Sequence, residues 1–420
     1  MIWNSIKGFS LFRYQKVLIM IGLTLVAYYA ALNRIQVFPW VIAALLLSSL
    51  ITSYLFPYLL VRNVSVTRTG PERAEENESI LFDVSIHNHG VFPRFMIQAI
   101  DKLPFINKIG VASNDEVLGV VAYIGSGGSH HFKVTVVCEK RGFYELGPVG
   151  ISTSFPFGLV EARHNKNGST QFLTVYPDIF PILSLPLLGT PSEIHRGGFL
   201  LPKGTGSAEF SGLREYRRGD NPRHIHWPTT ARTYELMIKE FEPLASASLH
   251  IILDQSKTSN VGKGKHSSFE YAVRIAASIC RYATNNSMTT AISPSWRENH
   301  SLGLGSGESH FRDTLDYLAI IDADSEIPYS TVITEATMNI GFGQTAVVFL
   351  SEPNEQISET IQSIAALKAQ GVNILAIHLD RDSFIDTATQ SRSGWENILD
   401  LGIEYISVKN GDNLTSVFNS

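Results

Sequence analysis

The sequence predicts a membrane-anchored, multidomain fold: an N-terminal transmembrane helical hairpin, an all-β immunoglobulin-like sandwich, and a doubly wound α/β domain. Three observations support this fold class. Two long uncharged runs open the chain, a region of period-two hydrophobic alternation follows, and the last part alternates apolar runs with amphipathic segments. These patterns are typical of bilayer-spanning helices, half-buried antiparallel strands, and parallel strands covered by helices.

The two uncharged runs are residues 17–33 and 35–61. As helices, each can cross about 30 Å of hydrocarbon, the first run only just and the second with length to spare. A cleaved signal peptide is the alternative for the first run, because small residues near Ala30 follow a basic start. The second apolar run comes directly after it, which a secreted protein does not require. We therefore expect transmembrane helices at about 17–33 and 36–60, in a first domain of residues 1–61.

The charges around these runs predict their orientation. The connecting turn contains only Arg34, whereas basic residues precede the first run and follow the second. These flanking residues are Lys7, Arg13 and Lys16 before, and Arg62, Arg68 and Arg73 after. Since positive flanks stay on the cytoplasmic side, we expect the bulk of the protein in the cytoplasm. The formal net charge of −5 argues against nucleic acid as a partner.

Residues 62–180 are expected to form the β-sandwich domain. In SILFDVSIHNHG, Ile80, Phe82, Val84 and Ile86 alternate with neighbours that face the other side of a strand. Turn signals such as NHG, GSGG and FPFG separate the runs at short intervals. Many short strands of this kind are typical of an immunoglobulin-like antiparallel sandwich.

Residues 246–420 change to strand–helix alternation. LHIILD, QTAVVFLS and VNILAIHLD are continuous apolar runs, as expected of strands buried on both faces. Between the first two, Phe269, Val273, Ala276 and Cys280 share one face of a predicted helix. This alternation predicts a mostly parallel, doubly wound sheet with helices on both faces.

Residues 181–245, rich in Pro, Gly and Ser, are expected to be a linker that carries an Arg-rich passage, GLREYRRGDNPRHIHWPTTAR. Asp220 is placed to cap a short helical turn, on which Arg223 and Trp227 share a face. Arginine forks suit carboxylates as well as phosphates. We therefore expect Arg214 and Arg223 to pair with carboxylates or carbonyls in an internal network. A docking surface for a partner is the second interpretation, and catalysis is the third.

Asp254, Ser256 and Thr258 directly follow the first predicted strand of the α/β domain. Ligands bind at the carboxyl ends of strands in open parallel sheets. One acid and two hydroxyls at alternate positions offer hard oxygen ligands, so Mg²⁺ is the one cofactor that the sequence suggests. The alternative is an aspartate that only caps the amides of its loop.

The Arg-rich passage resembles the signature of the bacterial membrane proteins called domain of unknown function 58: R-E-Y, G-D, P-R-x-I and W, then A-R and acidic residues. KRGFYELGPVGISTSFPFGL and TVYP resemble further elements of that family, so the resemblance covers nearly the whole chain. It implies a structural or partner-binding role for the signature and no catalytic residue. The signature residues are Arg214, Glu215, Tyr216, Gly219, Asp220, Arg223, Ile225, His226, Trp227 and Arg232.

The same resemblance implies a C-terminal domain similar to von Willebrand factor type A. In that domain an Asp-x-Ser-x-Ser loop joins a threonine and an aspartate from later loops to bind Mg²⁺ at a metal-ion-dependent adhesion site. Asp254, Ser256 and Thr258 match the first element, whereas the loop after the second strand reads Ser351-Glu352. We therefore expect Mg²⁺ binding to be weak or absent.

The family is associated with MoxR-type AAA+ ATPases. The resemblance thus implies a non-enzymatic scaffold or adaptor in the plasma (inner) membrane that binds such an ATPase during the assembly or maturation of a protein client. The alternative is a metal- or phosphate-dependent enzyme that uses Arg214, Arg223, His226 and Asp254. Convergence of these four side chains on an open cleft would favour the enzyme.

Overall fold

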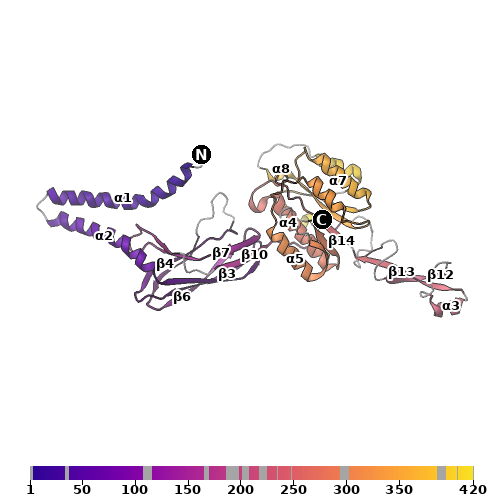
Figure 1. Ribbon diagram of the computed structural model, residues 1–420, viewed down its shortest axis with the longest axis horizontal. Coiled ribbons are helices and arrows are strands. Elements are labelled where there is room, and N and C mark those ends of the chain that lie inside the picture. The colour runs from indigo at the N-terminus through magenta and orange to yellow at the C-terminus, as the bar shows by residue number, and fades with distance from the viewer. Residues whose placement is uncertain are drawn as a thin grey trace. The chain divides into compact units, whose positions relative to one another are not determined.

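The structure is a computed structural model that divides into two compact units, residues 1–175 and 176–420 (Figure 1). The first unit holds two helices and an all-β region, and the second holds a small antiparallel sheet and an α/β fold. The structure describes residues 3–33, 37–106, 116–164, 170–185, 198–200, 208–216, 225–233, 235–246, 248–293, 302–385, 394–403 and 405–419.

Two helices open the first unit, α1 (Trp3–Asn33) and α2 (Val37–Val61), and they run side by side (Figure 1). Gln15–Asn33 and the whole of α2 are long and apolar enough to cross a membrane. Their large side chains are mostly exposed, for example Val26 at 67% and Leu45 at 63%. A soluble core helix would bury such residues, so this exposure fits a membrane anchor. The expected bounds agree with α2, whereas α1 begins well before the expected span.

Residues 64–176 form a β-sandwich. Its strands are β1 (Val64–Thr69), β2 (Arg73–Glu75), β3 (Ser79–Asn88), β4 (Arg94–Asp101), β5 (Glu116–Ile124), β6 (Ser129–Val137), β7 (Gly142–Leu146), β8 (Gly150–Thr153), β9 (Ala162–His164) and β10 (Gln171–Tyr176). They pair in the orders β1-β3-β6, β2-β10-β7 and β5-β4-β8-β9. Phe82 and Ile86 of β3 share one core with Ile97 of β4 and Leu173 of β10. The all-β expectation for this region is confirmed.

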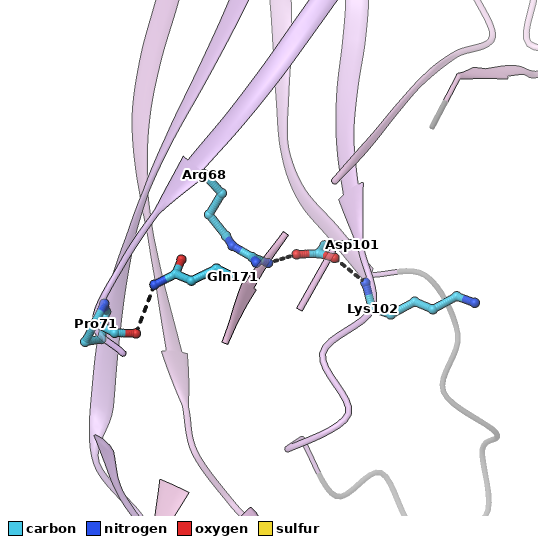
Figure 2. A network of polar contacts seen from close by, with 5 residues as sticks. All are labelled: Arg68, Pro71, Asp101, Lys102 and Gln171. Atoms are coloured by element: carbon cyan, nitrogen blue, oxygen red, sulfur yellow. Dashed lines mark hydrogen bonds and ion pairs between the residues drawn. The ribbon is translucent and has the colours of Figure 1, made fainter. Parts of the chain in front are cut away.

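A buried ion pair joins two sheets of the sandwich (Figure 2). Arg68 of β1 donates to the Asp101 carboxylate of β4, and both side chains are at most 1% exposed. Asp101 also accepts from the Lys102 amide at 2.8 Å, and the Arg68 guanidinium lies 5.1 Å from the centre of the Phe82 ring. Burial lowers the pKa of Arg68 to about 10, so the guanidinium stays charged at neutral pH.

Part of the expected linker is folded. β11 (Gly198–Leu200), β12 (Ala208–Glu215) and β13 (Met237–Ser246) form an antiparallel sheet in the order β11-β13-β12, and the short helix α3 (Trp227–Thr233) lies between β12 and β13 in the chain. The sequence of β12, AEFSGLRE, does not alternate cleanly between polar and apolar residues. This strand therefore gives no period-two signal, and its pairing with β13 defines it.

The α/β fold contains a six-stranded sheet in the order β16-β15-β14-β17-β18-β19, parallel except for β16. The strands are β14 (Ser248–Ile252), β15 (Thr289–Ile292), β16 (Leu302–Gly305), β17 (Thr345–Leu350), β18 (Asn373–Leu379) and β19 (Tyr405–Val408). The helices are α4 (Ser268–Asn285), α5 (Gly307–Ile320), α6 (Tyr329–Thr337), α7 (Ile357–Ala369), α8 (Arg381–Phe384) and α9 (Leu414–Phe418).

Residues of β17 alternate between two cores. Val347 and Phe349 pack in one core with residues of α4 and α5, whereas Val348 and Leu350 pack in the other with residues of α6 and α7. The predicted apolar face of α4, from Phe269 to Cys280, is buried in the first core. Helices therefore cover both faces of the sheet, as a doubly wound arrangement requires.

Candidate functional site

Three loops meet at the carboxyl edge of the six-stranded sheet. They begin after β14, β17 and β18, which are parallel neighbours and so end at the same edge. Arg381, the first residue of α8 just after β18, holds them together. Its Nη1 donates to the carbonyl oxygens of Thr258 at 2.8 Å, Ser259 at 3.3 Å and Ser351 at 3.2 Å.

The loop after β14 brings the three predicted metal-site residues together. Ser256 donates its amide to Asp254 Oδ1 at 3.0 Å. The Ser256 hydroxyl lies 3.0 Å from Thr258 Oγ1 and 2.9 Å from Ser259 Oγ, and Thr258 Oγ1 donates to Gln356 Oε1 at 3.2 Å. Asp254 is only 5% exposed. Ser259 and Gln356 are polar members of this cluster that the sequence pattern did not identify.

Glu352 adds a second buried carboxyl group to the site. It follows β17, is 3% exposed, and interacts electrostatically with Asp254. Burial, together with the nearby charge of Asp254, raises the pKa of Glu352 to about 8. Burial also raises the pKa of Asp254 to about 6. At neutral pH the two groups therefore hold about one proton between them.

Two oxygen atoms of this pair fit a cation. Asp254 Oδ2 and Glu352 Oε2 are buried and have no hydrogen-bond partner among the described residues. A buried carboxylate oxygen is unfavourable unless a proton, a donor or a cation meets it. Together with the neighbouring hydroxyls these are hard oxygen donors, which Mg²⁺ prefers. Within the described ranges, however, no group of three or more His, Cys, Asp or Glu side chains could hold a metal ion.

A polar cavity of about 270 Å³ lies beside Glu352. Its lining includes Glu352, Glu355, Asp380, Arg381 and Trp395. Because carboxyl groups outnumber the single guanidinium among these residues, the cavity favours a cationic group. A divalent cation or a basic side chain of a partner has this chemistry.

Tyr329 connects the two strands, β14 and β17, from which two of the site's loops begin. Its hydroxyl donates to the Ile252 carbonyl at 2.6 Å and accepts from the Phe349 amide at 3.0 Å, which joins β14 to β17 just before their carboxyl ends. The side chain is 1% exposed. The sequence gives no signal for Tyr329, because its partners are far away in the chain. Glu352 could have been identified from the sequence because, like Asp254, it is an acidic residue close after a buried apolar run.

Much of the Arg-rich passage lies outside the described residues, namely Gly219, Asp220, Arg223 and the side chain of Arg214. The expected pairing of the two arginines and the helix cap at Asp220 fall on these positions. The enzyme hypothesis requires both arginines to converge with His226 and Asp254 on one cleft, so it also depends on these positions. These hypotheses therefore stay predictions.

The described signature residues lie around α3 and the neighbouring ends of β12 and β13. His226 donates its amide to the Met237 carbonyl at 2.8 Å, and its Nδ1 lies 2.8 Å from Thr229 Oγ1. Trp227 is 65% exposed, so an internal network does not include its indole. Glu215 and Arg232 are also exposed, whereas Tyr216, Ile225 and His226 are half-buried. His226 belongs to the small sheet region, whereas Asp254 follows β14 of the six-stranded sheet.

Comparison with solved structures gives only low overall similarity. The CARDB domain of PF1109 from Pyrococcus furiosus is 15% identical, with a TM-score of 0.20, and the match covers 27% of this chain and 94% of that chain. The C-terminal domain of wzt is 12% identical, with a TM-score of 0.21, and the match covers 28% of this chain and 75% of that one.

Sequence comparison is more informative. "Uncharacterized protein YeaD" of Bacillus subtilis (strain 168) is 30% identical over 129 residues, which cover 31% of this chain and 30% of that relative. Residues 212–383 match the family described as "Protein of unknown function DUF58". The expected resemblance is thus confirmed over this stretch, which includes Asp254, Glu352 and Arg381 and runs from β12 through β18.

Proposed function

We propose that this chain is a non-enzymatic, membrane-anchored adaptor whose α/β fold binds a partner protein at the carboxyl edge of its sheet. The observation that carries the proposal is the buried pair Asp254 and Glu352, each with a carboxyl oxygen that has no hydrogen-bond partner among the described residues, together with the polar cavity that Glu352 lines. Arg381 and Tyr329 hold the surrounding loops and strands in place, so the site is preformed. A preformed site loses little conformational entropy on binding.

A divalent cation is one way in which this site would engage a partner. Asp254, Ser256, Thr258 and Glu352 would hold it, and it would supply open coordination positions to an acidic side chain of the partner. The similarity to von Willebrand factor type A domains that the family implies supports this arrangement. Without the cation, the acidic cavity suits a basic side chain.

The proposed partner is a MoxR-type AAA+ ATPase, acting together with a protein client. The resemblance to domain of unknown function 58 supports this choice, and residues 212–383 carry it. The two apolar helices supply the anchor, and their basic flanks favour the plasma (inner) membrane of a bacterium with the α/β fold in the cytoplasm. The adaptor would hold the ATPase and its client at the bilayer surface.

Direct binding tests this function. The full chain in lipid nanodiscs is titrated with the purified ATPase, and Asp254→Asn is compared with Glu335→Gln, which changes an exposed carboxylate on α6. We expect Asp254→Asn to weaken the Kd by roughly tenfold or more, and Glu335→Gln to leave it unchanged. Loss of binding in EDTA assigns the contact to a cation. Equal affinity of wild type and Asp254→Asn, with both folded, contradicts the proposal.

A further inference from the structure

One end of the β-sandwich is joined to the end of α2. Arg94 of β4 donates Nη1 to the Leu59 carbonyl at 2.6 Å and Nη2 to the Arg62 carbonyl at 2.7 Å, while its Nε donates to Asn88 Oδ1 at 3.1 Å. The last carbonyls of a helix have no partner within the helix, so this guanidinium caps α2. The cap fixes this end of the sandwich directly at the helix terminus.

A row of aromatic rings continues from α2 into the same end of the sandwich. The ring centre of Phe56, on α2, lies 6.2 Å from that of Phe155. Phe155 stacks on Phe95, with 5.4 Å between the ring centres. Phe95 in turn lies 5.5 Å from Tyr123. Tyr123 is 59% exposed, so the row ends at the surface.

Three loops surround this end: residues 89–93, 125–128 and 154–161. The only Asp, Glu, Lys or Arg in them is Glu161, which is paired with Arg163 at 2.8 Å. Phe92 is nevertheless 74% exposed and Phe157 55% exposed. Exposed apolar side chains gathered at one end of a domain mark an interaction surface rather than a solvated loop tip.

The third of these loops reaches along the helices. Leu159 and Val160 line an apolar groove of about 450 Å³ together with Ile21 of α1 and Tyr54 of α2. Tyr54 lies about 10 Å before the end of α2, at 1.5 Å per residue. Ile21 lies within Gln15–Asn33, the apolar segment of α1. The loop therefore reaches the depth of the proposed membrane span.

We infer that this end of the sandwich is seated in the lipid bilayer interface, with Val91, Phe92 and Phe157 inserted among the headgroups and upper acyl chains. The inference rests on the proposed membrane anchor. Lipid is the occupant because the apolar surface is continuous with the span, and because the loops would take no unpaired charge out of water: their single charged residue, Glu161, is ion-paired. Tyr123 has the amphipathic ring favoured at interfaces, and the exposed Arg62 is placed for lipid phosphate.

Spin-label depth measurement tests this seating. Phe92→Cys and Phe157→Cys are each labelled with a nitroxide in the full chain reconstituted into phosphatidylcholine–phosphatidylglycerol vesicles. Cys138 and Cys280 stay unlabelled because both are buried, which raises each thiol pKa to about 12. Leu47→Cys reports on the middle of α2. Phe172→Cys, on β10, has a parent side chain as exposed as Phe157, at 53%, and serves as the water-facing control.

We expect the ratio of oxygen to nickel-complex accessibility at Phe92 and Phe157 to be several-fold higher than at Phe172, and lower than at Leu47, which lies deeper in the bilayer. Ratios like that of Phe172, with Leu47 in the bilayer, overturn the inference and leave the anchor intact. Low accessibility to both reagents means that protein covers the loops, which also overturns it. A water-exposed Leu47 overturns the anchor and the inference together.

Discussion

Asp254 and Glu352 are two buried carboxyl groups whose pKa values change when the chain folds. A carboxyl with a higher pKa in the folded chain than in the unfolded chain binds its proton more tightly when folded. Its contribution to stability therefore decreases as pH rises from the unfolded to the folded pKa. For Glu352 this window runs from the ordinary value of 4.5 to about 8, and for Asp254 from 3.8 to about 6.

Glu352→Gln removes the titration and keeps the shape of the neutral acid. We expect this substitution to raise the free energy of unfolding by roughly 2–5 kcal/mol at about pH 9, and to change it little at about pH 3, where the wild-type group is protonated in both states. Denaturant unfolding of the full chain in detergent at both pH values measures this. Glu335→Gln, at an exposed position, is the control. A loss of stability at the higher pH would contradict the assignment.

The affinity of the site for a cation should depend on the protonation of the same carboxyl groups. A metal ligand must be deprotonated, so a cation competes with the proton on Glu352. We expect Mg²⁺ to bind weakly near neutral pH, with a Kd above about 10 µM, and to bind more tightly as pH rises from about 6 to 8. Calorimetry on the full chain measures this affinity, and Asp254→Ala should abolish the signal. Tight binding that does not depend on pH, or that survives Asp254→Ala, is the contrary result.

Between elements, the Arg68–Asp101 pair connects β1 to β4 in the sandwich core. Removing one partner leaves the other charge buried, so Arg68→Ala should lower the stability of the sandwich by roughly 3–5 kcal/mol. Arg68→Met combined with Asp101→Leu should recover most of this loss. The control is Lys133→Ala, which breaks the exposed pair Lys133–Asp83 at 3.9 Å. Thermal unfolding decides: equal Tm values for Arg68→Ala and Lys133→Ala would show that the buried pair contributes little.

The elements that sequence predicted well are those whose own residues determine their burial. α2 needs only an uncharged run, and β3 alternates Phe82 and Ile86, both buried, with Leu81 at 43% exposure. β12 was missed because its pattern is mixed and its partner β13 defines it. The site divides in the same way. Asp254, Ser256 and Thr258 share one loop, whereas the contacts of Tyr329 and Arg381 join segments that only the folded sheet brings together.

For the whole molecule, the charge pattern predicts a topology. Basic residues flank both apolar helices on the side of the two termini, so Ser420 should lie in the cytoplasm. A fluorescent protein fused after Ser420 should be bright in cells, and an alkaline phosphatase fused there should be inactive, because it needs the oxidising periplasm. An active phosphatase fusion would place the α/β fold outside and remove the proposed access to a cytoplasmic ATPase.

Site-specific photocrosslinking in cells tests whether the carboxyl edge of the six-stranded sheet binds the partner. A photoreactive amino acid replaces Glu355, at the polar cavity, or Met338, which precedes β17 at the opposite edge and is 85% exposed. We expect a crosslinked MoxR-type ATPase at Glu355, absent at Met338 and lost when Asp254→Asn is added. Crosslinking that is equal at both positions, or unchanged by Asp254→Asn, would show that the partner does not bind at this edge.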